Sequence, residues 1–347
     1  MTLSRREFLK LTGTSLTAAA LPISGGSQSL LRQAEPLSPT KQYARITDAA
    51  VPLRLRPDAD SATVGSREFD ELLEVGRKVV SPGVYPHNNV WLETPEGFIW
   101  ASEAQLVRNQ PNEIIDAIPA EGTWTEITVP FADGRMKADP VAPVRYRLYY
   151  GMVLNVNDRV TGSDGEIWYR VHDENGVVMF APGDAFRLIS SSELAPISPN
   201  VEDKAVVVNI TRQEISAMES GVEVYFARIS SGYAYYPEGG DFTSNTPIGS
   251  MWTWRKMVSR HMSGGDAVTG YDLPGVGWTV LFHGSGAALH STYWHADYGA
   301  PRSRGCINLL PEDAKWIFRW THPVVDFRPG DLTVQWPDPS TRVIVEV

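Results

Sequence analysis

The stretch LHSTYWHADYGAPRSRGCIN (residues 289–308) contains the single cysteine of this 347-residue chain, Cys306. A cysteine used for packing is usually surrounded by apolar residues, whereas Cys306 follows the polar and small residues Ser303, Arg304 and Gly305. Gly305 leaves room for a substrate, and the charge of Arg304 favours the thiolate over the thiol. A helix is predicted to start just beyond Cys306, and its free N–H groups would also favour the thiolate. The stretch therefore predicts a cysteine nucleophile with donors for an oxyanion.

A cysteine nucleophile also needs a general base, which histidine supplies most often. His290 lies sixteen positions before Cys306, at the end of an alternating apolar run, and His283 and His295 lie close to it in sequence. Proximity in sequence alone does not choose among the three. They lack the HExxH spacing and the matching carboxylates of a metal site, so we expect no metal and no cofactor.

Outward from this stretch, residues 204–347 predict a domain built mostly from strands. Residues 204–218 and 221–232 alternate apolar and polar side chains, and residues 278–294 carry two short apolar strands separated by Gly-Ser-Gly. The segment LLPEDAKWIFRW (residues 309–320) predicts the one main helix of the domain, because Pro311 stands near its start and two acidic residues follow in the first turn.

Two smaller β units are predicted before this domain. Residues 41–110 contain short strands broken by turns, and their segments LRP (55–57), VWL (90–92) and GFIW (97–100) resemble those of bacterial SH3-like barrels. Residues 111–190 repeat the scheme as a second, degenerate SH3-like unit, unless both form one continuous β domain. Such units either bind wall or peptide elements or act as spacers. A Pro- and Ser-rich linker is predicted at residues 191–203.

Residues 1–34 are interpreted as an export signal and a tether. SRREFLK (residues 4–10) and the weakly apolar run after it resemble a twin-arginine signal, although a basic, disordered N-terminus is the alternative. The apolar run is shorter than the roughly 20 residues of a membrane span. We therefore expect export by the twin-arginine machinery to the periplasm, cell wall or cell surface. A formal net charge of −10 argues against nucleic acid as a partner.

Several separated motifs occur in one consistent order. They are Ser230-Ser231-Gly232, Thr246-Pro247-Ile248-Gly249, Phe282-His283-Gly284, Leu289 to His295, Tyr298-Gly299 and Ser303 to Asn308. Together they resemble the catalytic domain of L,D-transpeptidases, the YkuD family. The resemblance covers roughly residues 203–347 and implies a mainly β fold for this domain.

The resemblance also implies site roles. Cys306 would be the nucleophile, His290 the general base, and the backbone carbonyl of Ser291 would orient the imidazole. The N–H groups of Gly305 and Cys306 would form the oxyanion hole. The remaining positions that match the motifs or lie near the predicted cleft are assigned to substrate binding: Arg304, Ser303, Asn308, His283, Tyr293 and Trp294. His261, His295 and Tyr271 are further candidates for the cleft, with packing as the alternative for each.

Two positions depart from the family pattern. Arg304 stands where the family usually has histidine, and Ser291 stands where it commonly has glycine. Neither departure removes the nucleophile or the base. Because arginine stays charged, a proton-transfer role at position 304 is not expected.

The implied function is peptidoglycan L,D-transpeptidation through a cysteine acyl-enzyme, with release of D-alanine from a tetrapeptide stem and with carbapenem-type β-lactams as expected inhibitors. If water is the acceptor, the same site is an L,D-carboxypeptidase. An NlpC-type endopeptidase is a further alternative, but that family places its cysteine before its histidine. A wall-binding protein without activity is the alternative from another class; the intact Cys306 and His290 argue against it.

Overall fold

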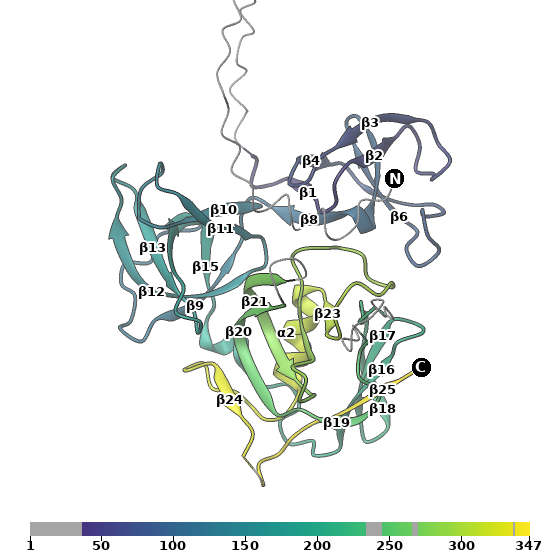
Figure 1. Ribbon diagram of the computed structural model, residues 1–347, viewed down its shortest axis with the longest axis vertical. Helices are drawn as coiled ribbons and strands as arrows, with labels where there is room; N and C mark the ends of the chain where they lie inside the picture. Colours follow the sequence, from purple (N-terminus) through teal and green to yellow (C-terminus); the bar gives the residue numbers. More distant parts are fainter. Residues whose placement is uncertain (1–36, 234–244, 266–269, 336) are drawn as a thin grey trace, which may run out of the picture.

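Figure 1 shows the computed structural model of the chain, which describes residues 37–233, 245–265, 270–335 and 337–347. The described residues form three β-rich units that follow one another along the chain. The predicted signal and tether at residues 1–34 lie outside the described residues. In the part of the chain that is described, no helix has the length and apolar character needed to cross a membrane.

The first unit packs two small sheets around a core that includes Ile46, Leu53 and Ile99. Its elements are β1 (Gln42–Ile46), β2 (Val51–Arg54), β3 (Thr63–Arg67), β4 (Leu72–Val75), β5 (Lys78–Val80), β6 (Val90–Thr94), β7 (Gly97–Trp100), the 3-10 turn η1 (Ala101–Glu103) and β8 (Ala104–Arg108). The sheet orders are β4-β1-β8 and β3-β2-β7-β6-β5. A hairpin closes at the Pro-Glu-Gly turn, where Thr94 pairs with Gly97 across β6 and β7.

The second unit is one seven-stranded sheet with the order β11-β10-β14-β13-β12-β9-β15. Its elements are β9 (Thr123–Ile127), β10 (Phe131–Arg135), β11 (Val144–Tyr149), β12 (Val153–Thr161), β13 (Ile167–His172), β14 (Val178–Pro182), the 3-10 turn η2 (Gly183–Ala185) and β15 (Phe186–Leu188). No described strand of the first unit pairs with it. The SH3-like character of both units stays a prediction.

The predicted linker at residues 191–203 is held against the third unit. It begins with the 3-10 turn η3 (Ser191–Leu194), which Ser190 and Glu193 close as a capping box. Glu193 also pairs with Lys315 of the third unit at 2.6 Å, and Leu194 is buried in the core of that unit. The linker therefore fixes the second and third units to each other.

The third unit contains two five-stranded sheets and one helix. Its elements are β16 (Lys204–Asn209), β17 (Glu214–Glu219), β18 (Val222–Arg228), β19 (Gly249–Trp252), β20 (Arg255–Gly264), β21 (Tyr271–Leu281), β22 (Ala288–Ser291), β23 (Ile307–Leu309), α2 (Pro311–Trp320), β24 (Asp331–Thr333) and β25 (Arg342–Glu346). The sheet orders are β18-β17-β16-β25-β19 and β23-β22-β21-β20-β24. The alternating segment at residues 204–218 is a hairpin of two strands, β16 and β17.

The predicted helix is confirmed as α2 and closes the core of the third unit. Pro311 occupies its first turn, and Ala314, Ile317 and Phe318 form its buried stripe at the spacing of an amphipathic helix. This stripe packs against residues from both sheets. Beyond its C-terminal end, the buried Lys256 donates to the carbonyl of Thr321 at 2.7 Å.

A separate core joins the second unit to the third. Leu154 and Val171 of the second unit pack in one cluster with Met257, Val276 and Leu281 of β20 and β21. In Figure 1 the second unit, drawn in teal, lies beside these two strands. The second unit is therefore a structural support of the sheet that carries the candidate site.

Candidate active site

The neighbouring strands β22 and β23 bring His290 and Cys306 together. They run parallel, with Leu289 opposite Ile307 and His290 opposite Asn308. Cys306 immediately precedes β23, so this register places it level with Ala288 on the strand that carries His290. A backbone hydrogen bond with Ala288 acts on the Cys306 thiol, in agreement with that register. A separation of sixteen positions along the chain is thus reduced to an offset of two residues between the paired strands.

Motifs that are far apart in the sequence surround the turn that carries Cys306. Ser230 exchanges backbone hydrogen bonds with Asn308, of 3.0 and 2.9 Å. The carbonyl of Ser231 accepts the N–H of Ser303 at 3.0 Å, and the N–H of Gly232 donates to the hydroxyl of Thr246 at 2.8 Å. These motifs are separated along the chain but are joined by hydrogen bonds in the backbone around Cys306.

Ser303 closes the turn that presents Cys306. Its hydroxyl donates to the Cys306 carbonyl at 2.5 Å and accepts the N–H of Gly305 at 3.2 Å. Gly305 has φ of +116°, and a Cβ there would stand 3.2 Å from the Asn245 carbonyl, so glycine is required. The N–H of Gly305, one of the two that the resemblance assigns to an oxyanion hole, is thus engaged within the turn in this structure.

His290 is buried and oriented as a neutral base. Its Nδ1 lies 2.8 Å from the carbonyl oxygen of Ser291, to which it donates as the N–H tautomer, and Nε2 is left as the proton acceptor. Burial lowers the pKa of His290 to about 4, the charge of Arg260 contributes, and the Ser291 carbonyl opposes the shift. The imidazole is therefore uncharged at neutral pH.

Cys306 is only partly exposed. The pKa of its thiol is shifted in the direction opposite to the one expected from the sequence. Burial raises the pKa of the Cys306 thiol, and the hydrogen bond with Ala288 and the charge of Arg260 offset only part of this. The net shift is opposite to the thiolate expected from the sequence, because burial outweighs the hydrogen bond with Ala288 and the charge of Arg260. α2 begins five residues later, at Pro311. At neutral pH the resting pair is a thiol beside a neutral imidazole.

This pairing makes a prediction about pH. The base must be unprotonated to accept the thiol proton, so we expect the acid limb of the acylation rate at about pH 4 instead of near 6.5. The measurement is the rate of covalent labelling of Cys306 by a carbapenem between pH 3.5 and 8, with circular dichroism at each pH to show that the protein remains folded. An acid limb near pH 6.5 would contradict the buried, neutral histidine.

The structure separates the predicted substrate-binding residues into two groups. Trp294 is partly buried, with its ring centroid 5.7 Å from that of His290. The guanidinium of Arg304 lies over the ring of Tyr271, 5.5 Å from its centroid. His283 lies in the turn between β21 and β22, where its Nδ1 is 2.8 Å from the Ser285 hydroxyl. These side chains keep partial access to solvent.

The other assignments to substrate binding are corrected by burial. Tyr293 is 3% exposed, donates to the Pro274 carbonyl and stacks on Tyr149 of the second unit. Asn308 is fully buried, and its amide nitrogen lies 2.8 Å from Nε2 of His295. Ser303 is 6% exposed. All three side chains are held inside the protein, and Ser303 closes the turn of Cys306, so their burial argues against contact with a bound peptide.

His261 is also a structural residue, since packing prevails over a place in the cleft. It is buried, and its Nδ1 lies 2.5 Å from a carboxylate oxygen of Asp173 in the second unit. Its Nε2 pairs with Asp272. Burial acts to lower the pKa of His261, but the hydrogen bonds with the two carboxylates outweigh it and raise the pKa. The imidazole therefore clamps β20 to the second unit.

Arg260 was not identified from the sequence. Its charge acts on Cys306, on His290 and on Tyr271. It stands on β20, two strands from His290 in the sheet order, and 46 positions before Cys306 in the sequence. No local pattern marks it, because its relation to the cysteine depends on pairings across three strands.

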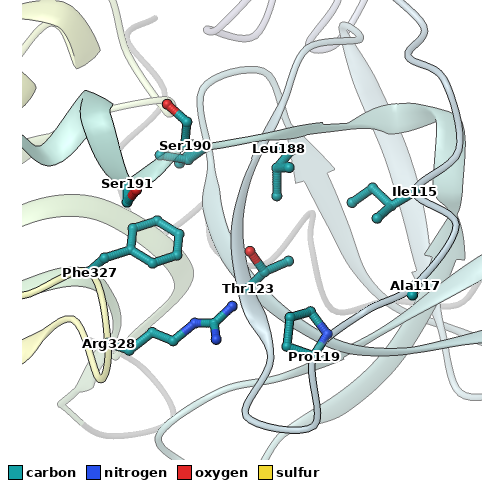
Figure 2. Close-up of a pocket in the computed structure, with 10 residues that line it drawn as sticks. Ile115, Ala117, Pro119, Thr123, Leu188, Ser190, Ser191, Phe327 and Arg328 are labelled. Carbon is teal, nitrogen blue, oxygen red and sulfur yellow. The ribbon is translucent and has the colours of Figure 1, made fainter.

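A cavity of about 520 Å³ lies elsewhere, between the second unit, the linker and the loop before β24. Figure 2 shows its lining, in which the Arg328 side chain lies across from Ile115 and Leu188. Arg328 pairs with Glu121. None of the lining residues belongs to the candidate active site. Among the described residues, no group of three His, Cys, Asp or Glu is placed to hold a metal ion.

Comparisons with known proteins concern the third unit. Residues 203–345 match the family model YkuD, described as the L,D-transpeptidase catalytic domain. No curated protein matches the chain. Among solved structures, a mutant of the Enterococcus faecium L,D-transpeptidase is similar, with 24% identity, 43% of this chain and 51% of that chain covered, and a TM-score of 0.32. The chain thus spans about half the length of that protein.

Two further similar structures contain bound β-lactams. L,D-transpeptidase 3 from Mycobacterium tuberculosis, in complex with a faropenem-derived adduct, has 20% identity, with 56% of this chain and 91% of that chain covered and a TM-score of 0.32. The LD transpeptidase LdtMt1, in complex with imipenem, has 20% identity, with 52% and 68% covered and a TM-score of 0.32. By the family match, residues 203–345 of this chain are an L,D-transpeptidase catalytic domain.

Proposed function

We propose that this chain is a peptidoglycan L,D-transpeptidase that works through an acyl-enzyme on Cys306. The observation that carries the proposal is the pair formed by Cys306 and His290 on adjacent strands of a domain of this family. A thiol beside a neutral, oriented imidazole is the arrangement for attack on a carbonyl. The nucleophile and the base come from the protein itself.

In the acylation step, Nε2 of His290 accepts the proton as Sγ of Cys306 attacks a carbonyl. The carbonyl belongs to the L-centre of the diamino acid in a tetrapeptide stem. The bond between that carbon and the nitrogen of D-alanine breaks, and the nitrogen takes the proton back from the imidazolium. D-alanine leaves, and the stem remains on Cys306 as a thioester. The donation from Nδ1 to the Ser291 carbonyl stabilises the transient imidazolium.

In the second step, an amine from another stem attacks the thioester. His290 accepts the ammonium proton and returns it to the departing Sγ, so that a new amide cross-link forms and the thiol is restored. Water in place of the amine gives a tripeptide and makes the same site an L,D-carboxypeptidase. Both outcomes use the same acyl-enzyme.

The direct test incubates the protein with a purified disaccharide-tetrapeptide and follows the products by mass spectrometry. We expect release of D-alanine together with cross-linked dimers. Release of D-alanine with tripeptide alone would replace the transferase assignment with a carboxypeptidase. If neither D-alanine nor a stem thioester is formed, the proposed function is wrong.

We further propose that carbapenem-type β-lactams acylate Cys306 and that the enzyme acts after export by the twin-arginine machinery. The first rests on the same thiol and base, since opening of the lactam ring is an acyl transfer to sulfur. The second rests on the SRREFLK segment at residues 4–10. Replacement of both arginines, Arg5 and Arg6, by lysine is the test of export, with the location of the mature protein as the readout.

A further inference from the structure

The loop between the base and the nucleophile carries a buried carboxylate. Asp297 is 2% exposed, and its Oδ2 accepts from Nε of Arg302 at 2.6 Å. The backbone carbonyl of Asp297 accepts the hydroxyl of Ser230, also at 2.6 Å. A buried carboxylate is costly unless hydrogen bonds and opposite charge satisfy its oxygens. Arg302 holds Oδ2, and the donor to Oδ1 comes from another unit of the molecule.

The first unit supplies this donor through His87, in the loop between β5 and β6. Its Nε2 lies 2.6 Å from Oδ1 of Asp297, although the two residues are 210 positions apart in the sequence. Burial acts to raise the pKa of Asp297, but the charge of Arg302 and the hydrogen bond with His87 help to lower it overall. Asp297 is therefore a charged acceptor, and Nε2 of His87 carries the proton.

Two aromatic rings of the first unit contact the imidazole of His87. Its centroid lies 6.1 Å from that of Tyr85, with the planes 12° apart, and 5.4 Å from that of Trp100. Trp100 is buried, and its Nε1 donates to the Asn88 carbonyl at 2.8 Å. The catalytic loop fits closely against this loop, since a Cβ at Gly299 would stand 3.1 Å from Cβ of His87. The orientation of His87 is thus set by packing within the first unit.

Asp297 and Arg302 lead directly to the turn of Cys306. The N–H groups of Arg302 and Ser303 both donate to the carbonyl of Ser231, at 2.9 and 3.0 Å. The Ser303 hydroxyl in turn donates to the Cys306 carbonyl at 2.5 Å. The ion pair of Arg302 with Asp297 is therefore one residue away from the side chain that closes the nucleophile turn.

We infer that His87 of the first unit is a positioning residue, which acts through Asp297 to fix the turn that presents Cys306. The inference rests on the proposed function. It gives the first unit a part in the reaction itself, beside the binding and spacer roles considered from the sequence. The rate of attack depends on alignment of the reacting atoms to within about 1 Å. A looser turn therefore slows acylation while the binding of the acyl donor is retained.

The first test measures the acylation rate of Cys306 as a function of carbapenem concentration. In His87→Leu we expect the limiting rate to fall about tenfold, since a misplacement of about 1 Å can cost 10²-fold. The half-saturating concentration should stay unchanged, because the residue acts on the attacking group. A loss of folded protein has a different signature, since it lowers the amplitude of acylation and leaves its rate constant as in the wild type.

Two conservative variants separate the hydrogen bond of His87 from polarity and packing. In His87→Gln the side-chain amide nitrogen reaches the place of Nε2 and should restore most of the rate. In His87→Asn the side chain is one methylene shorter and should restore little. Arg147→Met is the matched control, because it removes a contact of 3.1 Å between the second unit and Asp70 of the first. It should leave the acylation rate unchanged.

A double-mutant cycle tests whether His87 acts through Asp297. Asp297→Asn keeps the shape of the side chain and removes its charge, and it should itself slow acylation. If the two residues act as a pair, adding His87→Leu to Asp297→Asn should cost less than the loss of about tenfold that it causes alone. Thermal unfolding of each variant shows that the fold is retained at the assay temperature.

The outcomes separate the positioning role from the proposed function. Equal limiting rates in the wild type and in His87→Leu would overturn the positioning role, although the transpeptidase proposal stands. Equally slow acylation in His87→Gln and His87→Asn would overturn it too, because the effect would then not depend on the hydrogen bond. Fully additive effects in the cycle would show that His87 does not act through Asp297. If neither a carbapenem nor a tetrapeptide acylates the wild type, the proposed function fails, and the positioning role fails with it.

Discussion

Replacement of Cys306 by alanine is expected to abolish acyl-enzyme formation completely, both with a tetrapeptide donor and with a carbapenem. The chain has one cysteine, so no second thiol can take over the covalent step. The side chain is only partly exposed, and alanine retains the backbone of the Ser303 turn. We therefore expect the loss of activity without a large change in stability.

Intact-protein mass spectrometry after incubation with a carbapenem measures this directly. The wild type should gain the mass of one β-lactam, and Cys306→Ala should gain none. An adduct that persists on the alanine variant would place the nucleophile elsewhere. Circular dichroism of the variant serves as the control for folding. His290→Gln provides a second comparison, with acylation slowed by on the order of 10²- to 10⁴-fold because general-base assistance is removed.

Replacement of Arg45 by methionine is expected to destabilise the whole molecule by about 3 kcal/mol, the lower end for breaking a buried ion pair. Arg45 lies on β1 of the first unit and is fully buried. Its guanidinium donates to Asp70 at 2.8 Å and to the carbonyl of Tyr293 in the catalytic domain. It also lies over the Tyr149 ring of the second unit, 4.3 Å from its centroid. One side chain thus joins all three units.

The lower end of that range applies because Asp70 keeps a second cation. Arg147 lies 3.1 Å from the other carboxylate oxygen of Asp70 and remains in the variant. Urea unfolding followed by tryptophan fluorescence measures the change, and Arg77→Met is the matched control. Arg77 is an exposed partner of Glu93 on the first unit, for which a change within about 0.5 kcal/mol is expected. Equal stabilities of the two variants would show that Arg45 does not join the units energetically.

The resting state of the catalytic pair is where sequence and structure differ most in their chemistry. Positive charge near Cys306 in the sequence favours a thiolate, whereas the folded domain raises the pKa of the thiol by burial and lowers that of His290 to about 4. In the proposed mechanism, proton transfer must therefore accompany attack on the carbonyl. The contact between His290 and the Ser291 carbonyl was expected from the family resemblance and is present; its part in catalysis stays a prediction.

The sequence by itself determined the features that are written in contiguous residues. The helix at residues 311–320 follows from a proline, two acidic residues and an amphipathic stripe within ten positions. The cysteine turn follows from the order of Ser303, Gly305 and Cys306, and the hairpin at the Pro-Glu-Gly turn follows from its turn residues. The family motifs around His290 and Cys306 likewise consist of neighbouring residues.

Only the tertiary structure decided which side chains are buried and which distant charges meet. Tyr293 and His261 read as residues of a cleft, but the second unit covers them. Arg45 has no local signal, because packing brings it to the Tyr293 carbonyl from 248 positions away. Arg260, whose charge acts on Cys306 from 46 positions away, has none either. Burial and long-range pairing are properties of the assembled sheets. They therefore determine the pKa values of Cys306 and His290 and the packing of the strands that carry them.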